Sequence, residues 1–177
     1  MNTISDTRPS IVPIKDESGI FVRKPKITDG PAMTAMVRES GILDVNSDYA
    51  YLLMCTHFSM TCAIAEKDSE HAAFVTAYIP PEQQDTLFIW QICVRPAYQR
   101  LGLGVQLINA LLDRVECRHV RFVEATINPS NLASQKLFQS LAEQYGTAYK
   151  TSDFFTKDLF GSSHHEDEVL YKVGPLR

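Results

Sequence analysis

Residues 99–104 read QRLGLG and lie between a strand-like segment, TLFIWQICVRP (86–96), and a run of apolar residues at helical spacing. Glycine at the entry of a helix indicates either a tight backbone turn or the close approach of another group. Because Gly102 and Gly104 lack Cβ atoms, the amides of residues 100–105 can point into one concavity at the positive end of the helix, which suits a pyrophosphate. A tight strand-to-helix connection that binds nothing is the alternative that this stretch leaves open.

The two better-known phosphate loops fit this stretch poorly. A P-loop ends in Gly-Lys followed by Ser or Thr, whereas Gly104 is followed by Val105 and Gln106. A dinucleotide-binding fingerprint needs Gly or Ala where this chain has Leu107. The loop therefore predicts a different kind of anion site.

Hydrophobic periodicity on both sides of the loop predicts alternating strands and helices through the middle of the chain, with hairpins at its start and finish. This order is typical of an α/β (α+β) fold with a mixed, mostly antiparallel sheet and helices on both faces. The predicted strands are 20–25, 61–67, 71–81, 86–96, 119–127, 153–157 and 168–173, and the predicted helices are 28–40, a segment from about 47, 103–115 and 128–146.

Composition predicts one domain over residues 20–177, preceded by a flexible tail over 1–19. The tail carries prolines and charges and offers no apolar stretch for a signal peptide or a membrane span. A net charge of −4 with scattered basic residues argues against a nucleic-acid partner. Four cysteines without a C-x-x-C pair favour a reducing compartment, so we expect a cytoplasmic protein with no membrane partner.

The order Q-x-x-G-x-G, helix, strand ending at Asn128 and then SNLASQKLF (130–138) resembles motifs A and B of the GNAT acetyltransferases. The resemblance implies acetyl-CoA as cosubstrate. It implies that the strand before the loop bulges and splays from the next strand, which admits the pantetheine arm. It also implies that a backbone amide, that of Val94, polarises the thioester carbonyl. Asn131 could instead cap its helix. The cofactor-binding residues that the resemblance implies are Ile92, Val94, Gln99, Arg100, Leu101, Gly102, Leu103, Gly104, Asn128, Asn131 and Lys136.

Four further stretches, 43–58, 74–81, 87–94 and 164–171, resemble the diaminobutyrate acetyltransferases of ectoine synthesis, a branch of that family. The resemblance implies acetyl transfer to the γ-amine of L-2,4-diaminobutyrate by direct attack on the thioester, in a homodimer. It implies a substrate-binding wall of Asp44, Tyr49, Trp90, His165 and Glu168. We expect Glu168 and His165 to act as candidate bases and Val94 to complete the catalytic groups.

Each wall residue also has an ordinary structural interpretation. Asp44 is in the turn before Ser47 and could belong to a helix cap, and Tyr49 could face solvent. Trp90 alternates with Phe88 and Ile92, which predicts one shared face and a core position.

The stretch SSHHEDE (162–168) invites a metal site or, alternatively, a solvated acidic loop. Adjacent histidines on a loop do not share a face, and acyl transfer from a thioester needs no metal. We therefore predict no metal.

One position departs from the family pattern. Phe138 stands where many GNAT enzymes have a tyrosine that protonates the leaving thiolate, and Tyr145 and Tyr149 are the possible substitutes. The general acid is therefore unassigned. Two other functions stay open: acetylation of another small amine or a protein amine, and a non-catalytic acyl-CoA sensor.

Overall fold

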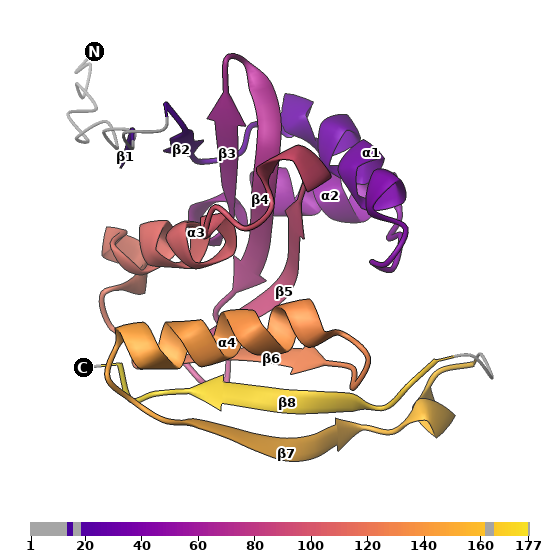
Figure 1. The fold of residues 1–177 in the computed structure, drawn as a ribbon, viewed down its shortest axis with the longest axis vertical. Coiled ribbons are helices and arrows are strands. Elements are labelled where there is room, and N and C mark those ends of the chain that lie inside the picture. The colour runs from indigo at the N-terminus through magenta and orange to yellow at the C-terminus, as the bar shows by residue number, and fades with distance from the viewer. Residues whose placement is uncertain (1–13, 16–18, 162–164, 177) are drawn as a thin grey trace, which may run out of the picture.

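A computed structural model describes residues 14–15, 19–161 and 165–176, and these form one eight-stranded sheet with the order β1-β2-β3-β4-β5-β6-β8-β7 (Figure 1). The strands are β1 (Ile14–Lys15), β2 (Phe21–Arg23), β3 (Ala63–Lys67), β4 (Glu70–Tyr78), β5 (Thr86–Val94), β6 (Phe122–Ile127), β7 (Tyr149–Phe155) and β8 (Glu168–Val173). The α-helices are α1 (Gly30–Ser40), α2 (Asp48–Thr56), α3 (Leu103–Leu112) and α4 (Leu132–Gln144). The predicted tail over 1–19 lies outside the described residues except for β1 and Gly19.

The centre of the sheet is splayed. Among the described strands, β5 and β6 are the one parallel pair, and they pair only where Thr86–Phe88 meets Phe122–Glu124. Beyond these residues the two strands diverge, which leaves the rest of β5 without a neighbour on that edge. This confirms the predicted mixed sheet with a splayed central pair.

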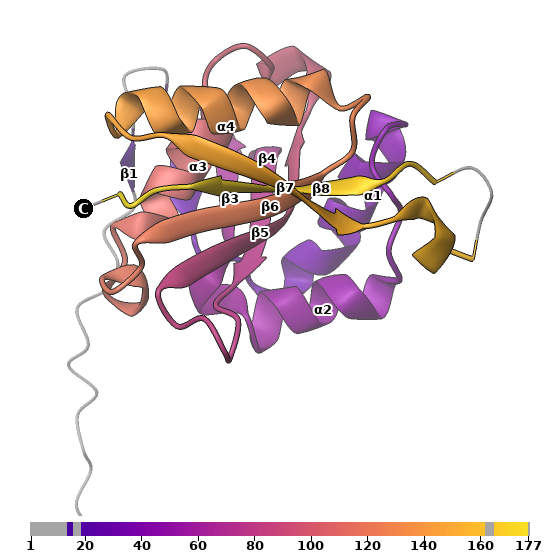
Figure 2. The ribbon, with the colours of Figure 1, turned by 90° about the horizontal axis from the view of Figure 1, so that it is seen from below.

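Helices cover both faces of the sheet, as the sequence predicts (Figures 1 and 2). The larger core joins α3 and α4 to one face, through residues such as Leu107, Leu111 and Leu141. The smaller core joins α1 and α2 to the other face, where Tyr51 packs with Phe74. The diverging strands therefore open between two helical layers.

A β-bulge at Trp90 corrects one prediction. Thr76 pairs with Gln91 but Ala77 pairs with Ile89, so Trp90 is an extra residue in β5. A bulge shifts the alternation of side chains by one residue. Trp90 accordingly stacks on Tyr51, in the α1–α2 layer, whereas Ile92 packs against the opposite core. The expected shared face of Trp90 and Ile92 was wrong, because strict alternation fails at the bulge.

None of the described helices combines the length and the apolar character that crossing a membrane requires.

Candidate active site

A cavity of about 1180 Å³ occupies the gap between the diverging strands. Its walls come from the loop between α1 and α2, the end of β4 and the loop that follows it, the middle of β5, the cavity-facing side of β6, the first turns of α4 and the segment around β8. Segments far apart in the sequence therefore meet around one space. Such a cavity, with polar groups on an apolar lining, is the usual form of a small-molecule site.

Beside the cavity, the loop 99–104 enters α3 with two residues in the left-handed region, Arg100 at φ 62° and Gly102 at φ 74°. Gly102 is the N-cap, and no side chain of the described residues caps the helix. The first amides of α3 therefore have no partner within the helix and can receive an anion. The predicted anion site has the required backbone geometry.

Glycine is required at position 104 for a different reason than at position 102. Gly104 is buried in the first turn of α3, and a Cβ atom there would lie 2.3 Å from Cδ1 of Leu137 in α4. Close packing of α3 against α4 therefore requires glycine at this position. The two glycines combine a turn with a helix–helix contact, so the structural alternative holds in part for Gly104.

The free edge of β5 offers backbone amides to the gap. The Arg95 amide donates to the carbonyl oxygen of Ala72 in the direction of β4 (3.0 Å). Because successive amides of a strand point to opposite edges, the amides of Val94 and Ile92 point away from β4 toward the gap. They have the orientation that a carbonyl oxygen held between the strands would need.

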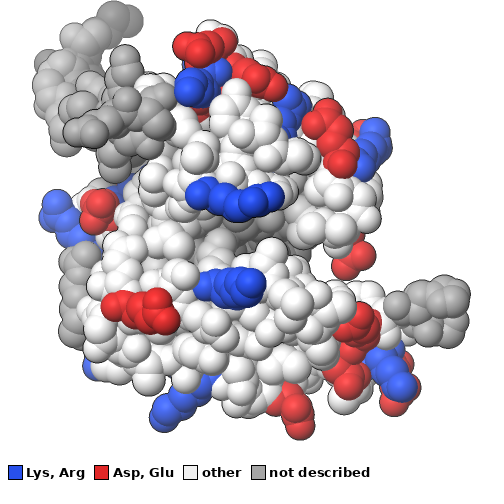
Figure 3. Space-filling view, viewed as in Figure 1, with Lys and Arg blue, Asp and Glu red and all other residues white. Residues whose placement is uncertain are grey.

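The predicted cofactor residues divide into two groups. Ile92, Asn128 and Asn131 line the cavity, whereas Val94, Lys136 and the loop 99–104 are not part of its wall. Oδ1 of Asn131 also accepts the amide of Ser134 (3.1 Å). Asn131 therefore caps α4, which was the alternative interpretation of this residue. On the face formed by α3 and α4, two basic side chains lie on opposite sides of a hollow (Figure 3).

Asp44 and His165 meet across the cavity although more than a hundred residues separate them in the sequence. Nε2 of His165 lies 3.6 Å from Oδ2 of Asp44, and its ring stacks on Phe160 with the centroids 3.6 Å apart. Nδ1 lies 2.7 Å from the carbonyl oxygen of Glu166. The pKa of His165 is raised, first because the protonated ring donates to this carbonyl and also because Asp44 and Glu168 are nearby.

Glu168, at the start of β8, also lines the cavity. Burial raises the pKa of its carboxyl group, and a hydrogen bond with Thr126 and the charge of His165 oppose the shift only partly. A carboxylate with a raised pKa is a stronger base. Asp44, His165 and Glu168 thus form an acidic and titratable end of the cavity that can accept ammonium groups.

Comparison with known proteins assigns the chain to a family, since residues 33–142 match the model of the acetyltransferase (GNAT) family. The chain belongs to the GNAT family. The L-2,4-diaminobutyric acid acetyltransferase of Shouchella clausii (strain KSM-K16) is 47% identical over 158 residues, 89% of this chain and 88% of that protein. The Bordetella parapertussis (strain 12822) enzyme of the same name is 39% identical over 175 residues, 97% and 94% of the two chains.

A solved structure supports the same assignment. The diaminobutyrate acetyltransferase of Paenibacillus lautus, in complex with L-2,4-diaminobutyric acid and coenzyme A, aligns with a TM-score of 0.86 and 34% identity. The alignment covers 89% of this chain and 96% of that chain. This GNAT protein is an acetyl-CoA-dependent N-acetyltransferase, as the sequence predicts.

Tyr49 does not reach the cavity of this GNAT chain. Its side chain is 68% exposed, and it is not part of the cavity wall. Tyr51, two residues later, is fully buried and stacks on Trp90, with the ring centroids 6.4 Å apart. Positions i and i+2 of an α-helix are rotated by about 200° about the helix axis, so the two tyrosines face opposite ways. The spacing of Tyr51 and Cys55, both buried, was the signal that could have identified the inward face.

Glu124 and Lys172 are cavity residues that the sequence reasoning missed. Oε1 of Glu124 lies 2.7 Å from Nζ of Lys172, and the Glu124 side chain is nearly buried. Nζ of Lys172 also lies 4.3 Å from the centroid of the Phe122 ring. A charged residue inside each of two strand-like runs was the available signal, because burial of such a group requires a partner.

Neither tyrosine proposed as a substitute general acid lines the cavity. The hydroxyl of Tyr145 donates to Oδ1 of Asn109 (3.1 Å), and the ring of Tyr149 stacks on Tyr171. Phe138 does line the cavity, which places a side chain without a donor where the family tyrosine stands. Both tyrosines have packing contacts in the GNAT fold instead.

The acidic stretch 162–168 binds neighbouring loops. Residues 162–164, including the first of the two histidines, lie outside the described residues. Oε2 of Glu166 accepts the amide of Ser130 (3.0 Å), and Oδ1 of Asp167 accepts the amide of Lys157 (2.7 Å). Both residues are exposed, which fits the alternative of a solvated acidic loop, and their carboxylates also bind the amides of two neighbouring loops.

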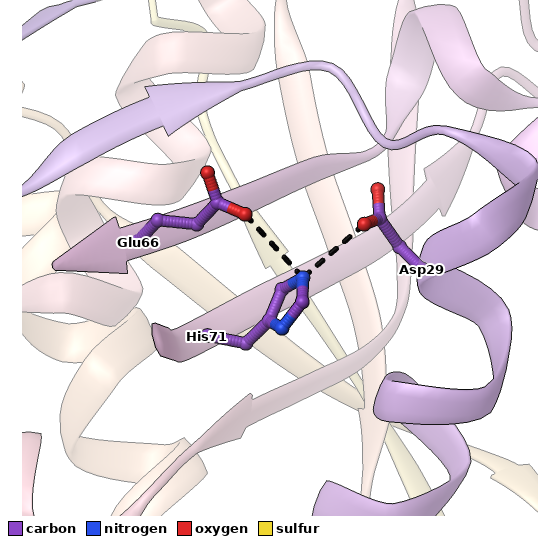
Figure 4. A group of neighbouring side chains, drawn as sticks. All are labelled: Asp29, Glu66 and His71. Carbon is purple, nitrogen blue, oxygen red and sulfur yellow. Dashed lines mark hydrogen bonds and ion pairs between the residues drawn. The ribbon is translucent and has the colours of Figure 1, made fainter. Parts of the chain in front are cut away.

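Outside the cavity, Asp29, Glu66 and His71 bring their ligand atoms within 4.8 Å of one another (Figure 4). Nε2 of His71 lies 3.2 Å from Oδ1 of Asp29 and 3.4 Å from Oε1 of Glu66. The guanidinium of Arg23 donates to both carboxylates, at 2.7 and 2.9 Å to Asp29 and 2.9 Å to Oε2 of Glu66. Arg23 thus supplies the positive charge that a metal would bring, and the cluster is a charge network that holds β2, α1 and β3 together.

Asp29→Asn is expected to lower the free energy of unfolding at pH 7 by about 1–2 kcal/mol, after allowance for solvent screening. Burial by itself would raise the pKa of Asp29, but hydrogen bonds from Arg23, the Lys26 amide and His71 outweigh it and lower the pKa from 3.8 to about 2. A lowered folded-state pKa gives stability that is present above pH 3.8 and is lost as pH falls toward 2. The difference between wild type and variant, measured by urea unfolding, should therefore shrink over that range.

Glu70→Gln is the control for this prediction, because Glu70 pairs with Arg95 at the surface with half of its side chain exposed. It should change stability by less than about 0.5 kcal/mol. A stability difference for Asp29→Asn that stays constant from pH 7 to pH 2 would contradict the assigned role of its carboxylate.

Proposed function

We propose that this protein transfers the acetyl group of acetyl-CoA to the γ-amine of L-2,4-diaminobutyrate, giving N4-acetyl-L-2,4-diaminobutyrate for ectoine synthesis. The observation that carries the proposal is the convergence of Asp44, His165 and Glu168 at the gap between β5 and β6. A diamino acid brings two ammonium groups, and an acidic cavity end suits them. The relatives described above bear the name of this activity.

The cofactor site in this proposal runs from the loop 99–104 to the splayed strands. The amides of the loop and of the first turn of α3 hold the pyrophosphate, with Lys136 reaching a phosphate from α4. Ile92 and Val94 bind the pantetheine arm through their backbone groups, and Asn128 and Asn131 line the gap beside it. This arrangement presents the thioester to the acidic end of the cavity.

The substrate site in this proposal is the wall formed by Asp44, Trp90, His165 and Glu168. The carboxylates of Asp44 and Glu168 attract the ammonium groups, and the face of Trp90 packs against the short aliphatic chain. Tyr49, which the resemblance also implies for this wall, is exposed and lies outside the cavity wall, so it is not included in this proposal.

Acetyl transfer begins with loss of a proton from the amine. An alkyl amine with a pKa near 10.4 is about three units from neutrality at pH 7, a cost of about 4–5 kcal/mol for the reactive form. Glu168 takes that proton, with His165 as the neighbouring base. The nitrogen lone pair then attacks the thioester carbon, and the oxyanion of the tetrahedral intermediate accepts a hydrogen bond from the Val94 amide. Collapse breaks the C–S bond and the thiolate leaves. Because Glu168 already holds the first proton, the amide nitrogen releases its second proton to His165.

The test is an acetyl-CoA consumption assay against diaminobutyrate, ornithine, lysine, spermidine and a peptide. We expect diaminobutyrate to have the highest kcat/KM. A preference for another amine would overturn the substrate, and acetyl-CoA binding without turnover of any amine would support a sensor, the function that Phe138 favours.

We further propose that residues 20–177 are one acetyltransferase domain that acts in the cytoplasm as a homodimer. The exposed residues of β7 and its neighbourhood support a partner surface, since Phe154, Phe155 and Leu159 are 48%, 42% and 69% exposed. The four cysteines are all free, which suits a reducing compartment. Light scattering after size exclusion should give twice the 19.9 kDa chain mass, and a monomer would contradict the dimer.

A further inference from the structure

One buried side chain connects the loop that carries Asp44 to the bulged strand β5. Nε2 of Gln91 donates to the backbone carbonyl of Asp44 (3.0 Å), and its Oε1 accepts from the hydroxyl of Tyr51 (2.8 Å). Gln91 is 8% exposed and Tyr51 is fully buried. A buried amide whose donor and acceptor both have partners holds its position strongly, because breaking either bond leaves an unsatisfied group.

The orientation of the Gln91 amide follows from its partners. The Asp44 carbonyl can only accept, so the NH₂ group must face it, and the oxygen then faces the Tyr51 hydroxyl. The backbone of Gln91 is fixed as well, since Oγ1 of Thr76 donates to its carbonyl beside the bulge (3.3 Å). Gln91 is therefore held at both its backbone and its side chain.

Tyr51 joins this connection to Trp90. Its ring stacks on Trp90 at an interplanar angle of 29° while its hydroxyl binds Gln91. The bulge residue and the Asp44 loop, two parts of the substrate wall, are thus held by the same pair of side chains. Gln91 also lines the cavity, whereas Tyr51 does not, so Tyr51 can affect how that wall is arranged without contacting the substrate.

We propose that Gln91 and Tyr51 are positioning residues that set the affinity for the amine substrate by fixing the positions of Asp44 and Trp90 relative to each other. The inference rests on the proposed function and adds two residues to its substrate site. Gln91→Glu keeps an acceptor for Tyr51 but turns an oxygen toward the Asp44 carbonyl, which breaks the connection to the loop. Tyr51→Phe keeps the ring on Trp90 and removes only the hydroxyl.

The experiment compares these two variants with Gln139→Glu. Nε2 of Gln139 likewise donates a hydrogen bond, to the hydroxyl of Tyr149 (3.2 Å), and Gln139 is not part of the cavity wall, so the same chemical change is made away from the substrate. We expect Gln91→Glu to raise KM for diaminobutyrate about tenfold and Tyr51→Phe about threefold, with KM for acetyl-CoA within about twofold of wild type. Gln139→Glu should change neither value.

A second measurement does not depend on turnover. Hydrogen exchange of the amides of residues 42–46 should become faster in Gln91→Glu and stay unchanged in Gln139→Glu. Trp90 is the single tryptophan of the chain, so its fluorescence also reports whether the ring at position 51 shifts against it once the hydrogen bond to Gln91 is lost in Tyr51→Phe. Unchanged exchange and an unchanged KM for the amine would overturn the positioning roles. Absence of wild-type turnover would instead overturn the proposed function, while the exchange data would still decide the inference.

If Gln91→Glu does not fold, Tyr51→Phe decides the inference, since it retains the buried ring. A rise in both KM values together with a large fall in Tm would mean that the pair only stabilises the fold. That result would also overturn the inference.

Discussion

Glu168→Gln is expected to lower kcat for diaminobutyrate by about 100- to 1000-fold and to leave KM for acetyl-CoA nearly unchanged. The variant keeps the size of the side chain and one acceptor oxygen, but it cannot accept the substrate proton. Glu168 lines the cavity at the start of β8, away from the loop 99–104, so binding of the cofactor should not depend on it. Steady-state kinetics with each substrate varied in turn measures both quantities.

The pH dependence of kcat gives this prediction a second readout. Burial raises the pKa of Glu168, and only its deprotonated form accepts a proton, so kcat should rise with pH through that raised pKa. Glu168→Gln should lose this rise. Glu166→Gln is the matched control. Glu166 lies two residues before Glu168, but its carboxylate accepts the Ser130 amide and has no part in the proposed proton transfer. Wild-type kcat in Glu168→Gln, or an equal loss in Glu166→Gln, would remove Glu168 as the base.

Local patterns in the sequence predict most of the fold. The spacing of Leu103, Leu107 and Leu111 identifies α3 and its buried face, and the glycines of 99–104 identify the turn before it. Such features depend on residues within one or two helical turns. The anion loop and the helix that follows it can therefore be predicted from the amino-acid sequence alone.

Positions that depend on pairing between strands were not accessible in the same way. The resemblance to the family implies a bulge in this strand, but no pattern within β5 places it at Trp90. Its position shows only in the pairing of Thr76 and Ala77 of β4 with Gln91 and Ile89. The contact between Asp44 and His165 joins the loop after α1 to the loop before β8, so only the resemblance to a family suggested it. The buried pair Tyr51 and Cys55 shows the inward phase of α2, but Tyr49 was taken from the family resemblance without use of that phase.

Gly104→Glu is expected to raise KM for acetyl-CoA about 100-fold, equivalent to about 2.7 kcal/mol of binding free energy. Its Cβ would lie 2.3 Å from Cδ1 of Leu137, so that side chain must move, and Leu137 lines the cavity. The added carboxylate also lies in the first turn of α3, whose amides are proposed to hold the pyrophosphate. Displacement of Leu137 and repulsion between like charges both weaken cofactor binding.

Two control variants separate these causes. Gly104→Ala makes the same contact with Leu137 without the charge, so it should raise KM for acetyl-CoA by less than about tenfold. Gly102→Ala meets no atom within 4 Å and changes only a residue at φ 74°, at a cost of about 1 kcal/mol to the turn. Measured KM and Tm for the three variants distinguish cofactor binding from packing. If Gly104→Ala and Gly104→Glu gave the same KM, the glycine would serve helix packing alone, and the pyrophosphate would have to lie elsewhere than the amides at the start of α3.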